Sequence, residues 1–143
     1  MKSKIILIIS LIVILLSSNY VMGKVNIWYL PHPDDETIGM ADAIHTAVKN
    51  NEENIFIFFT RGGASKTRHF LIDKESNVYH LTRPELEQAR IKETLSALKV
   101  LGVQLEDVLF LNYTEGNIPK NDVKQLMNTF IQLYPSGVHS TVA

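Results

Sequence analysis

The chain has 143 residues, with 14 lysines and arginines against 15 aspartates and glutamates, and 45% of its residues are hydrophobic. This balance is typical of one globular domain and argues against a long disordered chain, a collagen-like repeat or a basic nucleic-acid-binding arm. Because the chain has no cysteine, disulfide scaffolds, iron–sulfur clusters and cysteine nucleophiles are excluded, and any metal must be bound by histidine, carboxylate or water.

The N-terminal segment, residues 1–23, has the features of a secretory signal peptide. Two lysines precede an apolar run from Ile5 to Leu16, and Val21-Met22-Gly23 supplies small or modest residues for signal peptidase cleavage. The alternative is an uncleaved membrane anchor, although the run reaches the about 20 residues that span a bilayer only if its polar tail is included. We therefore expect a secreted or extracytoplasmic protein, or one anchored by this segment, whose residues 24–143 form one domain.

Beyond the signal segment, the sequence predicts short strands that alternate with amphipathic helices. Three runs are rich in β-branched and aromatic residues and too short to favour helices, so they predict buried strands at Val25–Leu30, Asn54–Phe59 and Val108–Leu111. The insertion-like stretch from Ser65 to His80 has two interpretations, a mobile lip over the cleft and a plain surface loop, and we favour the surface loop because variable loops normally lie at the surface.

Three helices are predicted between and after these strands. The first, at about Thr37–Lys49, carries its apolar stripe at Ile38, Ala41, Ile44 and Val48. The second begins at a capping box formed by Thr82 and Glu85 and stops at Gly102, because glycine suits a left-handed helix end. The third lies near Asn121–Leu133 and is apolar on one side.

The alternation of strands and helices predicts a Rossmann-like, three-layer α/β/α fold. Short strands joined by helices require right-handed crossovers and a mostly parallel sheet that is covered on both faces. Ligands bind such sheets beyond the carboxyl ends of the strands. The loop after the first strand is therefore the first place to look for chemistry.

That loop, Pro31–Glu36, contains one imidazole and three carboxylates, from His32, Asp34, Asp35 and Glu36. Carboxylates this close repel one another unless a cation or hydrogen-bond donors compensate their charges. One interpretation is helix capping, in which an aspartate accepts from the first amides and Glu36 favours the positive helix end. The other is a metal site, and the residue types alone leave both open.

Four motifs, in the same order along the chain, resemble those of the PIG-L/LmbE-like zinc-dependent N-deacetylases. Pro31–Glu36 (PHPDDE) resembles the family's HPDDE signature after a hydrophobic strand. Thr60–Gly63 resembles its T-x-G turn, Arg90–Val103 its R-x-x-E-x-x-x-A-x-x-x-L-G-V helix, and Tyr113–Gly116 stands in the place of its D-G turn. A single HPDDE is suggestive, whereas the ordered set strongly favours the metal site.

The resemblance implies a hydrolase that removes an N-acyl group, typically acetyl, from an amino sugar or a related small glycoconjugate. It implies that His32 and Asp35 bind a catalytic Zn²⁺, or another divalent metal, and that Asp34 is the general base toward the metal-activated water. Arg61 and Arg90 are weaker candidates for substrate binding, because most surface arginines are solvated or ion-paired. The expected partner is a small N-acylated sugar and not nucleic acid, with membrane contact only through an uncleaved signal segment.

The C-terminal end departs from the family pattern. Catalytic zinc usually has three protein ligands, and the family supplies the third from an HPDH-like segment after the fourth strand. Gly137–Ala143 resembles that strand, and His139 is not in the HPDH position. We therefore expect the third ligand beyond Ala143, a fold that is incomplete at the C-terminus, and a fragment of a longer protein. The alternative function is a non-catalytic carbohydrate-binding domain or an inactive fragment.

Overall fold

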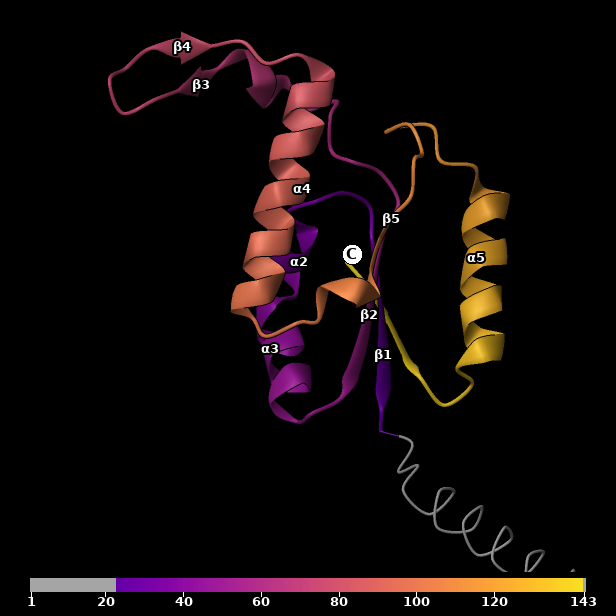
Figure 1. The fold of residues 1–143 in the computed structure, drawn as a ribbon. Coiled ribbons are helices and arrows are strands. Elements are labelled where there is room, and N and C mark those ends of the chain that lie inside the picture. The colour runs from indigo at the N-terminus through magenta and orange to yellow at the C-terminus, as the bar shows by residue number, and fades with distance from the viewer. Residues whose placement is uncertain (1–22, 143) are drawn as a thin grey trace, which may run out of the picture.

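Four parallel strands form the central sheet of the computed structural model, which describes residues 23–142 (Figure 1). In chain order the strands are β1 (Val25–Leu30), β2 (Glu53–Phe58), β5 (Val108–Phe110) and β6 (Val138–Thr141). They lie in the order β5-β2-β1-β6, and each neighbouring pair is parallel. The three predicted strands and the mostly parallel sheet are confirmed, and the carboxyl ends of all four strands meet at one edge.

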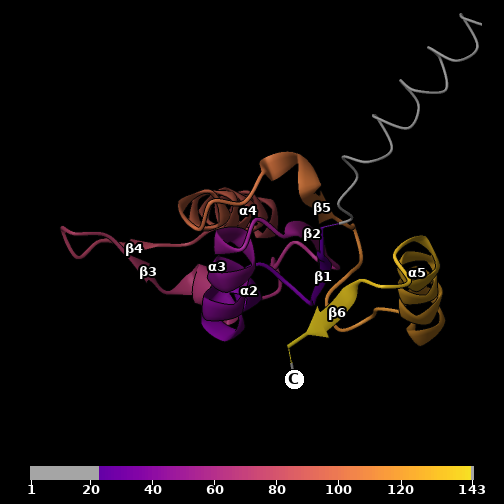
Figure 2. The ribbon, with the colours of Figure 1, turned by 90° about the horizontal axis from the view of Figure 1, so that it is seen from below.

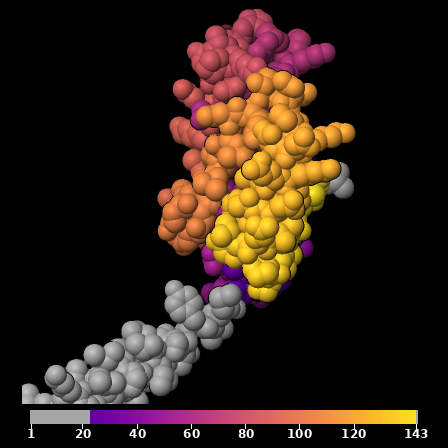
Figure 3. Space-filling view, turned by 90° about the vertical axis from the view of Figure 1, so that its right-hand side faces the viewer, coloured from indigo at the N-terminus to yellow at the C-terminus, as the bar shows by residue number. Residues whose placement is uncertain are grey.

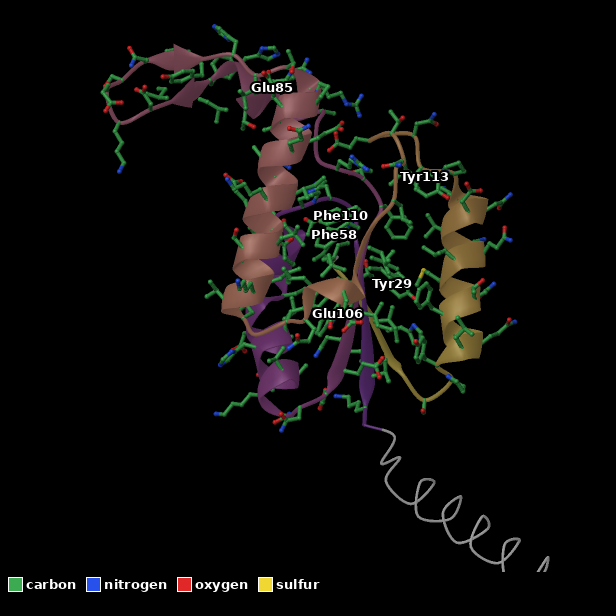
Figure 4. The ribbon with its side chains drawn as sticks, in the orientation of Figure 1. Tyr29, Phe58, Glu85, Glu106, Phe110 and Tyr113 are labelled. Carbon is green, nitrogen blue, oxygen red and sulfur yellow. The ribbon has the colours of Figure 1, made fainter. Side chains whose placement is uncertain are left out.

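Side chains alternate between the two faces of the sheet, and both faces are buried. One face packs Trp28, Leu30, Phe56 and Phe58 against a cluster that includes Ile44 and Leu98. The other packs Ile27, Tyr29, Ile55, Ile57 and Phe59 against residues of the last helix. Figure 4 shows Phe58 and Phe110 on one side of the sheet, where their rings stack, and Tyr29 directed toward the other. Burial on both faces explains why β1 and β2 are mostly apolar.

Helices cover both faces, which confirms the predicted three layers. On one side lie α2 (Asp35–Gly39), α3 (Ala41–Lys49) and α4 (Arg83–Val100), and on the other lies α5 (Lys120–Leu133) (Figure 2). The space-filling view in Figure 3 shows α5 spread over its side of the molecule. Two short 3₁₀ helices, η1 (Lys66–His69) and η2 (Leu105–Asp107), complete the helical elements of the described residues.

The helix predicted at Thr37–Lys49 is wrong in its boundaries, because the chain forms two helices that meet at Met40. Met40 has a φ of −133°, outside the helical range, and is itself buried. The break turns Ile38 out of the predicted stripe, leaving it 82% exposed, whereas Ile44 remains in the core. Beside the break, Gly39 packs against Val142, the residue after β6, and a Cβ on Gly39 would lie 2.9 Å from Cγ1 of Val142.

The boundaries of α4 follow the predicted signals. The backbone N–H and the hydroxyl of Thr82 each donate to Oε2 of Glu85 at 2.7 Å, as expected for a capping pair. These hydrogen bonds lower the pKa of the Glu85 carboxyl. The helix ends before Gly102, whose φ of +89° is the left-handed conformation that glycine adopts without strain.

The stretch interpreted as a surface loop contains a short antiparallel hairpin. Its strands, β3 (Leu71–Ile72) and β4 (Val78–Tyr79), form a separate two-stranded sheet that extends away from the first turn of α4 (Figure 1). The loop that joins them is closed by Asp73, whose carboxylate accepts hydrogen bonds from Glu75, Asn77 and Tyr79.

We expect the loop of this hairpin to lose stability as the pH falls through the pKa of Asp73. Hydrogen bonds, chiefly from Asn77, hold the pKa of Asp73 at about 2, below its ordinary value of 3.8. A carboxylate with a lowered pKa in the folded state stabilises that state above its unfolded pKa, and this contribution is lost as the pH falls through the folded pKa. The protection of the Asn77 amide from exchange, measured by NMR relative to its intrinsic rate at each pH from about 5 to about 2, should therefore fall. Asp73→Asn should remove this pH dependence, and an unchanged profile would contradict the assignment.

The predicted signal segment lies outside the described residues, apart from Gly23, so cleavage and export stay predictions. Among the helices of residues 23–142, none is long and apolar enough to cross a bilayer.

Candidate metal centre at the carboxyl edge of the sheet

The loop between β1 and α2 borders a pocket of about 430 Å³ at the carboxyl edge of the sheet. Because the strands are parallel, the loops that follow β1, β2 and β5 meet there. The pocket is lined by Pro31, His32 and Asp34 after β1, by Thr60, Ala64 and Ser65 after β2, by Glu115, Gly116 and Ile118 after β5, and by Arg90 of α4. Its volume is in the range of small-molecule sites.

His32, Asp34 and Asp35 converge on one point of this loop. Nδ1 of His32 lies 3.0 Å from Oδ1 of Asp34 and 3.3 Å from Oδ2 of Asp35, and one ligand atom of each residue lies within 4.8 Å of the others. Two ligands bound tetrahedrally at zinc distances are about 3.4 Å apart. An imidazole nitrogen and carboxylate oxygens at this spacing fit a zinc ion or another divalent metal.

The aspartate side chains do not cap α2. Asp34 is the N-cap residue, but its side chain makes no capping hydrogen bond, and its backbone carbonyl instead accepts from Thr37 and Ile38. The carboxylate of Asp35 turns back and accepts from the N–H of His32 at 3.1 Å. The capping interpretation of these two side chains is therefore wrong, and both carboxylates stay close to the imidazole.

Glu36 is not part of this group. It is only 1% exposed and accepts from the N–H of Asp34 and from the hydroxyl of Thr94 on α4, each at 2.9 Å. Burial raises the pKa of the Glu36 carboxyl above its ordinary value, and the hydrogen bonds offset this only in part. The structure thus separates Glu36 from the three residues that could hold a metal.

The two candidate arginines occupy different places. Nη1 of Arg90 lies 3.2 Å from Oδ2 of Asp34 and donates to the carbonyl of Pro33 at 3.3 Å, so Arg90 belongs to the pocket that contains His32. Arg61 is exposed and lines a separate polar pocket beside the Arg83–Glu87 ion pair. A substrate role for either arginine stays a prediction, and only Arg90 contacts the proposed base.

His139 lies away from this loop. It pairs in register with Ile27, its Nδ1 is 3.0 Å from the hydroxyl of Tyr29, and its ring stacks on that tyrosine. Thr141 pairs with Tyr29, so β6 runs toward the edge that carries His32.

The sequence analysis did not identify three residues whose hydrogen bonds connect the loops around the pocket. The hydroxyl of Thr60 donates to the carbonyl of Pro31 at 3.0 Å, and the carboxylate of Glu115 accepts from the N–H of Ala64. Thr94 holds Glu36 from α4. Thr60 and Glu115 were within recognised motifs, which could have suggested them, but nothing in the sequence distinguishes Thr94 from an ordinary helix residue.

Gly62 allows Arg90 to approach the loop. Its φ is +74°, and a Cβ there would lie 2.7 Å from Cδ of Arg90. We expect Gly62→Ala to lower the free energy of unfolding by about 2 kcal/mol or more, because the left-handed conformation and the overlap both cost energy. Gly116→Ala is the matched control, since Gly116 has a φ of +77° with no atom within 4 Å of the added Cβ. Denaturant titration should give a smaller loss, about 1 kcal/mol, for Gly116→Ala, and equal losses would contradict the packing argument.

The fold and this loop define an α/β protein with a His/Asp cluster at the carboxyl ends of parallel strands. Residues 27–141 match the PIG-L family, described as GlcNAc-PI de-N-acetylase, and the chain belongs to that family. No curated protein matches the chain by sequence.

Two solved structures share the fold. The N,N'-diacetylchitobiose deacetylase from Pyrococcus horikoshii is 27% identical, with a TM-score of 0.61 over 77% of this chain and 37% of that one. GalB, the 4-carboxy-2-hydroxymuconate hydratase from Pseudomonas putida KT2440, is 16% identical, with a TM-score of 0.59 over 76% of this chain and 43% of that one, which shows the fold alone. The chain thus spans less than half of each of these proteins.

Proposed function

We propose that the protein containing this chain is a metal-dependent hydrolase that removes an N-acetyl or similar N-acyl group from an amino sugar or a related glycoconjugate. Membership of the GlcNAc-PI de-N-acetylase family and likeness to a diacetylchitobiose deacetylase support the reaction class. The observation that carries the proposal is the convergence of His32 and Asp35 beside Asp34, at the edge of a pocket that His32 and Asp34 line. Zinc is the proposed metal, held by His32, Asp35 and a third ligand from beyond Ala143.

Zinc held by His32 and Asp35 would polarise the amide carbonyl of the substrate and lower the pKa of a water molecule. The side chain of Asp34 then performs the proton transfers. Arg90 contacts Oδ2 of Asp34, and Nδ1 of His32 lies 3.0 Å from Oδ1. We assign the proton that water releases, as it adds to the carbonyl carbon, to Oδ1, the oxygen that is not paired with the guanidinium. The same oxygen returns that proton to the nitrogen as the carbon–nitrogen bond breaks, which gives acetate and a free amine.

Arg90 supports the base by charge and by position. Its guanidinium carries a fixed positive charge beside the carboxylate of Asp34 and orients that side chain. Its second contact, to the carbonyl of Pro33, ties the guanidinium to the backbone of the same loop. Asp34 is therefore held between an imidazole on one oxygen and a guanidinium on the other.

The direct test is acetate release from a panel of N-acetylated sugars by the full-length protein loaded with one equivalent of zinc. We expect acetate and free amine in equal amounts from at least one sugar, and we expect a chelator to abolish the reaction. A zinc-loaded protein that binds these sugars without releasing acetate would contradict the enzyme proposal and support the carbohydrate-binding alternative.

A further inference from the structure

Glu36 is a buried carboxylate that the proposed reaction does not use. It is 1% exposed and borders a small cavity between α2 and α4, on the other side of the loop from His32. Its Oε1 accepts from the hydroxyl of Thr94, and its Oε2 accepts from the backbone N–H of Asp34. Burying an ionisable side chain costs hydration free energy, and an apolar side chain at the same position would not incur this cost. Packing alone therefore does not explain a carboxylate here.

The backbone of Asp34 explains what this carboxylate does. Asp34 has a φ of +104°, and among the described non-glycine residues only Asn51 and Ser76 also have positive φ. A side chain makes this conformation costly, and it persists only where the surroundings compensate the cost. The N–H of Asp34 faces the carboxylate of Glu36 in this conformation. The side chain of Asp34 thus contacts His32 and Arg90, while its backbone N–H donates to the carboxylate of Glu36.

Helix α4 contributes the two residues that hold Asp34, one through its side chain and one through its backbone. Arg90 and Thr94 are four residues apart and so lie on the same side of the helix. Arg90 contacts the carboxylate of Asp34, and Thr94 donates to Glu36, which in turn accepts from the N–H of Asp34. One rigid element therefore fixes the side chain of Asp34 directly and its backbone through Glu36.

We propose that Glu36 is a positioning residue whose carboxylate, held by Thr94, fixes the left-handed backbone of Asp34 and so directs the Asp34 side chain at the reacting water. The proposal rests on the proposed function, because it assumes that Asp34 is the base. Glu36 itself touches neither metal nor substrate.

The decisive variant is Glu36→Leu, because leucine is similar in size to glutamate but accepts no hydrogen bond. If Glu36 positions Asp34, Glu36→Leu lowers kcat about 10- to 100-fold, the usual loss for a supporting hydrogen bond at such a site, while KM and bound zinc stay unchanged. The amide of Asp34 also loses its protection from hydrogen exchange, which NMR measures without any activity or metal. Wild-type kcat and a protected Asp34 amide in Glu36→Leu would overturn the proposal.

Two further variants keep the proposal testable if Glu36→Leu folds poorly. Glu36→Gln should keep most of the activity and the protected amide, because its carbonyl accepts from Asp34 and its amino group donates to Thr94. Thr94→Val, which removes one donor at similar volume, should give an intermediate loss of kcat. A Gln variant as impaired as the Leu variant would contradict the hydrogen-bond argument.

Glu52→Gln is the matched control. Glu52 also accepts a hydrogen bond from a buried residue, Asn26, but it lies just before the amino end of β2, at the opposite edge of the sheet from the pocket. Its replacement should leave kcat and the exchange of the Asp34 amide unchanged. If the wild-type protein releases no acetate, the proposed function fails; if it is active and Glu36→Leu is equally active, only the positioning role fails.

Discussion

Replacing Asp34 with asparagine should lower kcat about 10²- to 10⁴-fold, the usual contribution of a general base, and leave bound zinc unchanged. Asparagine has the same shape and can still accept from Arg90 through its amide oxygen, but it cannot take a proton from water. We therefore expect an intact fold with little change in KM. The measurement is steady-state acetate release together with zinc content by elemental analysis.

This variant also separates two roles that the geometry alone permits. Asp34 belongs to the same group of possible ligands as His32 and Asp35. Loss of zinc from Asp34→Asn would make Asp34 a ligand, and full activity would show that it is not the base. Either result would contradict the division of roles proposed here.

Removing a proposed ligand should give the second large effect. We expect His32→Ala and Asp35→Asn each to weaken zinc binding more than about 100-fold, because even residues that only support metal ligands cost 10- to 100-fold. Activity should fall in parallel at limiting zinc and recover in part at high zinc. Competition with a chromophoric chelator measures the affinity directly.

The matched controls lie on α3. His45→Ala and Asp42→Asn change the same residue types at exposed positions on that helix. Neither should alter zinc affinity or kcat. If the controls and the proposed ligands weaken binding equally, the zinc would not be bound at the loop after β1.

The sheet could be predicted because the sequence signals for its strands lie within short stretches of the chain. Mostly apolar runs such as Val25–Leu30 and Asn54–Phe59 are buried on both faces, and the capping residues of α4 mark its start directly. The break at Met40 could not be predicted, because the apolar spacing continues through it. Packing of Gly39 on Val142, about one hundred residues further along the chain, accompanies the break.

The candidate site likewise has a part that could be predicted from the sequence and a part that could not. The closeness of His32, Asp34 and Asp35 follows from their adjacency in one loop. The contacts of Arg90 and Thr94 with that loop join residues more than fifty positions apart, so no local pattern contains them. Glu36 is the clearest case, since a glutamate in a first helical turn is expected at the surface and is instead among the most buried residues described.

A crystal structure of the full-length protein with zinc, with anomalous scattering recorded at the zinc edge, tests the central claim most directly. We expect one zinc ion at the carboxyl end of β1, with a ring nitrogen of His32 and a carboxylate oxygen of Asp35 each about 2.0–2.2 Å from it. An anomalous peak elsewhere, with these two side chains turned away from each other, would contradict the proposed metal centre and the hydrolase activity inferred from it.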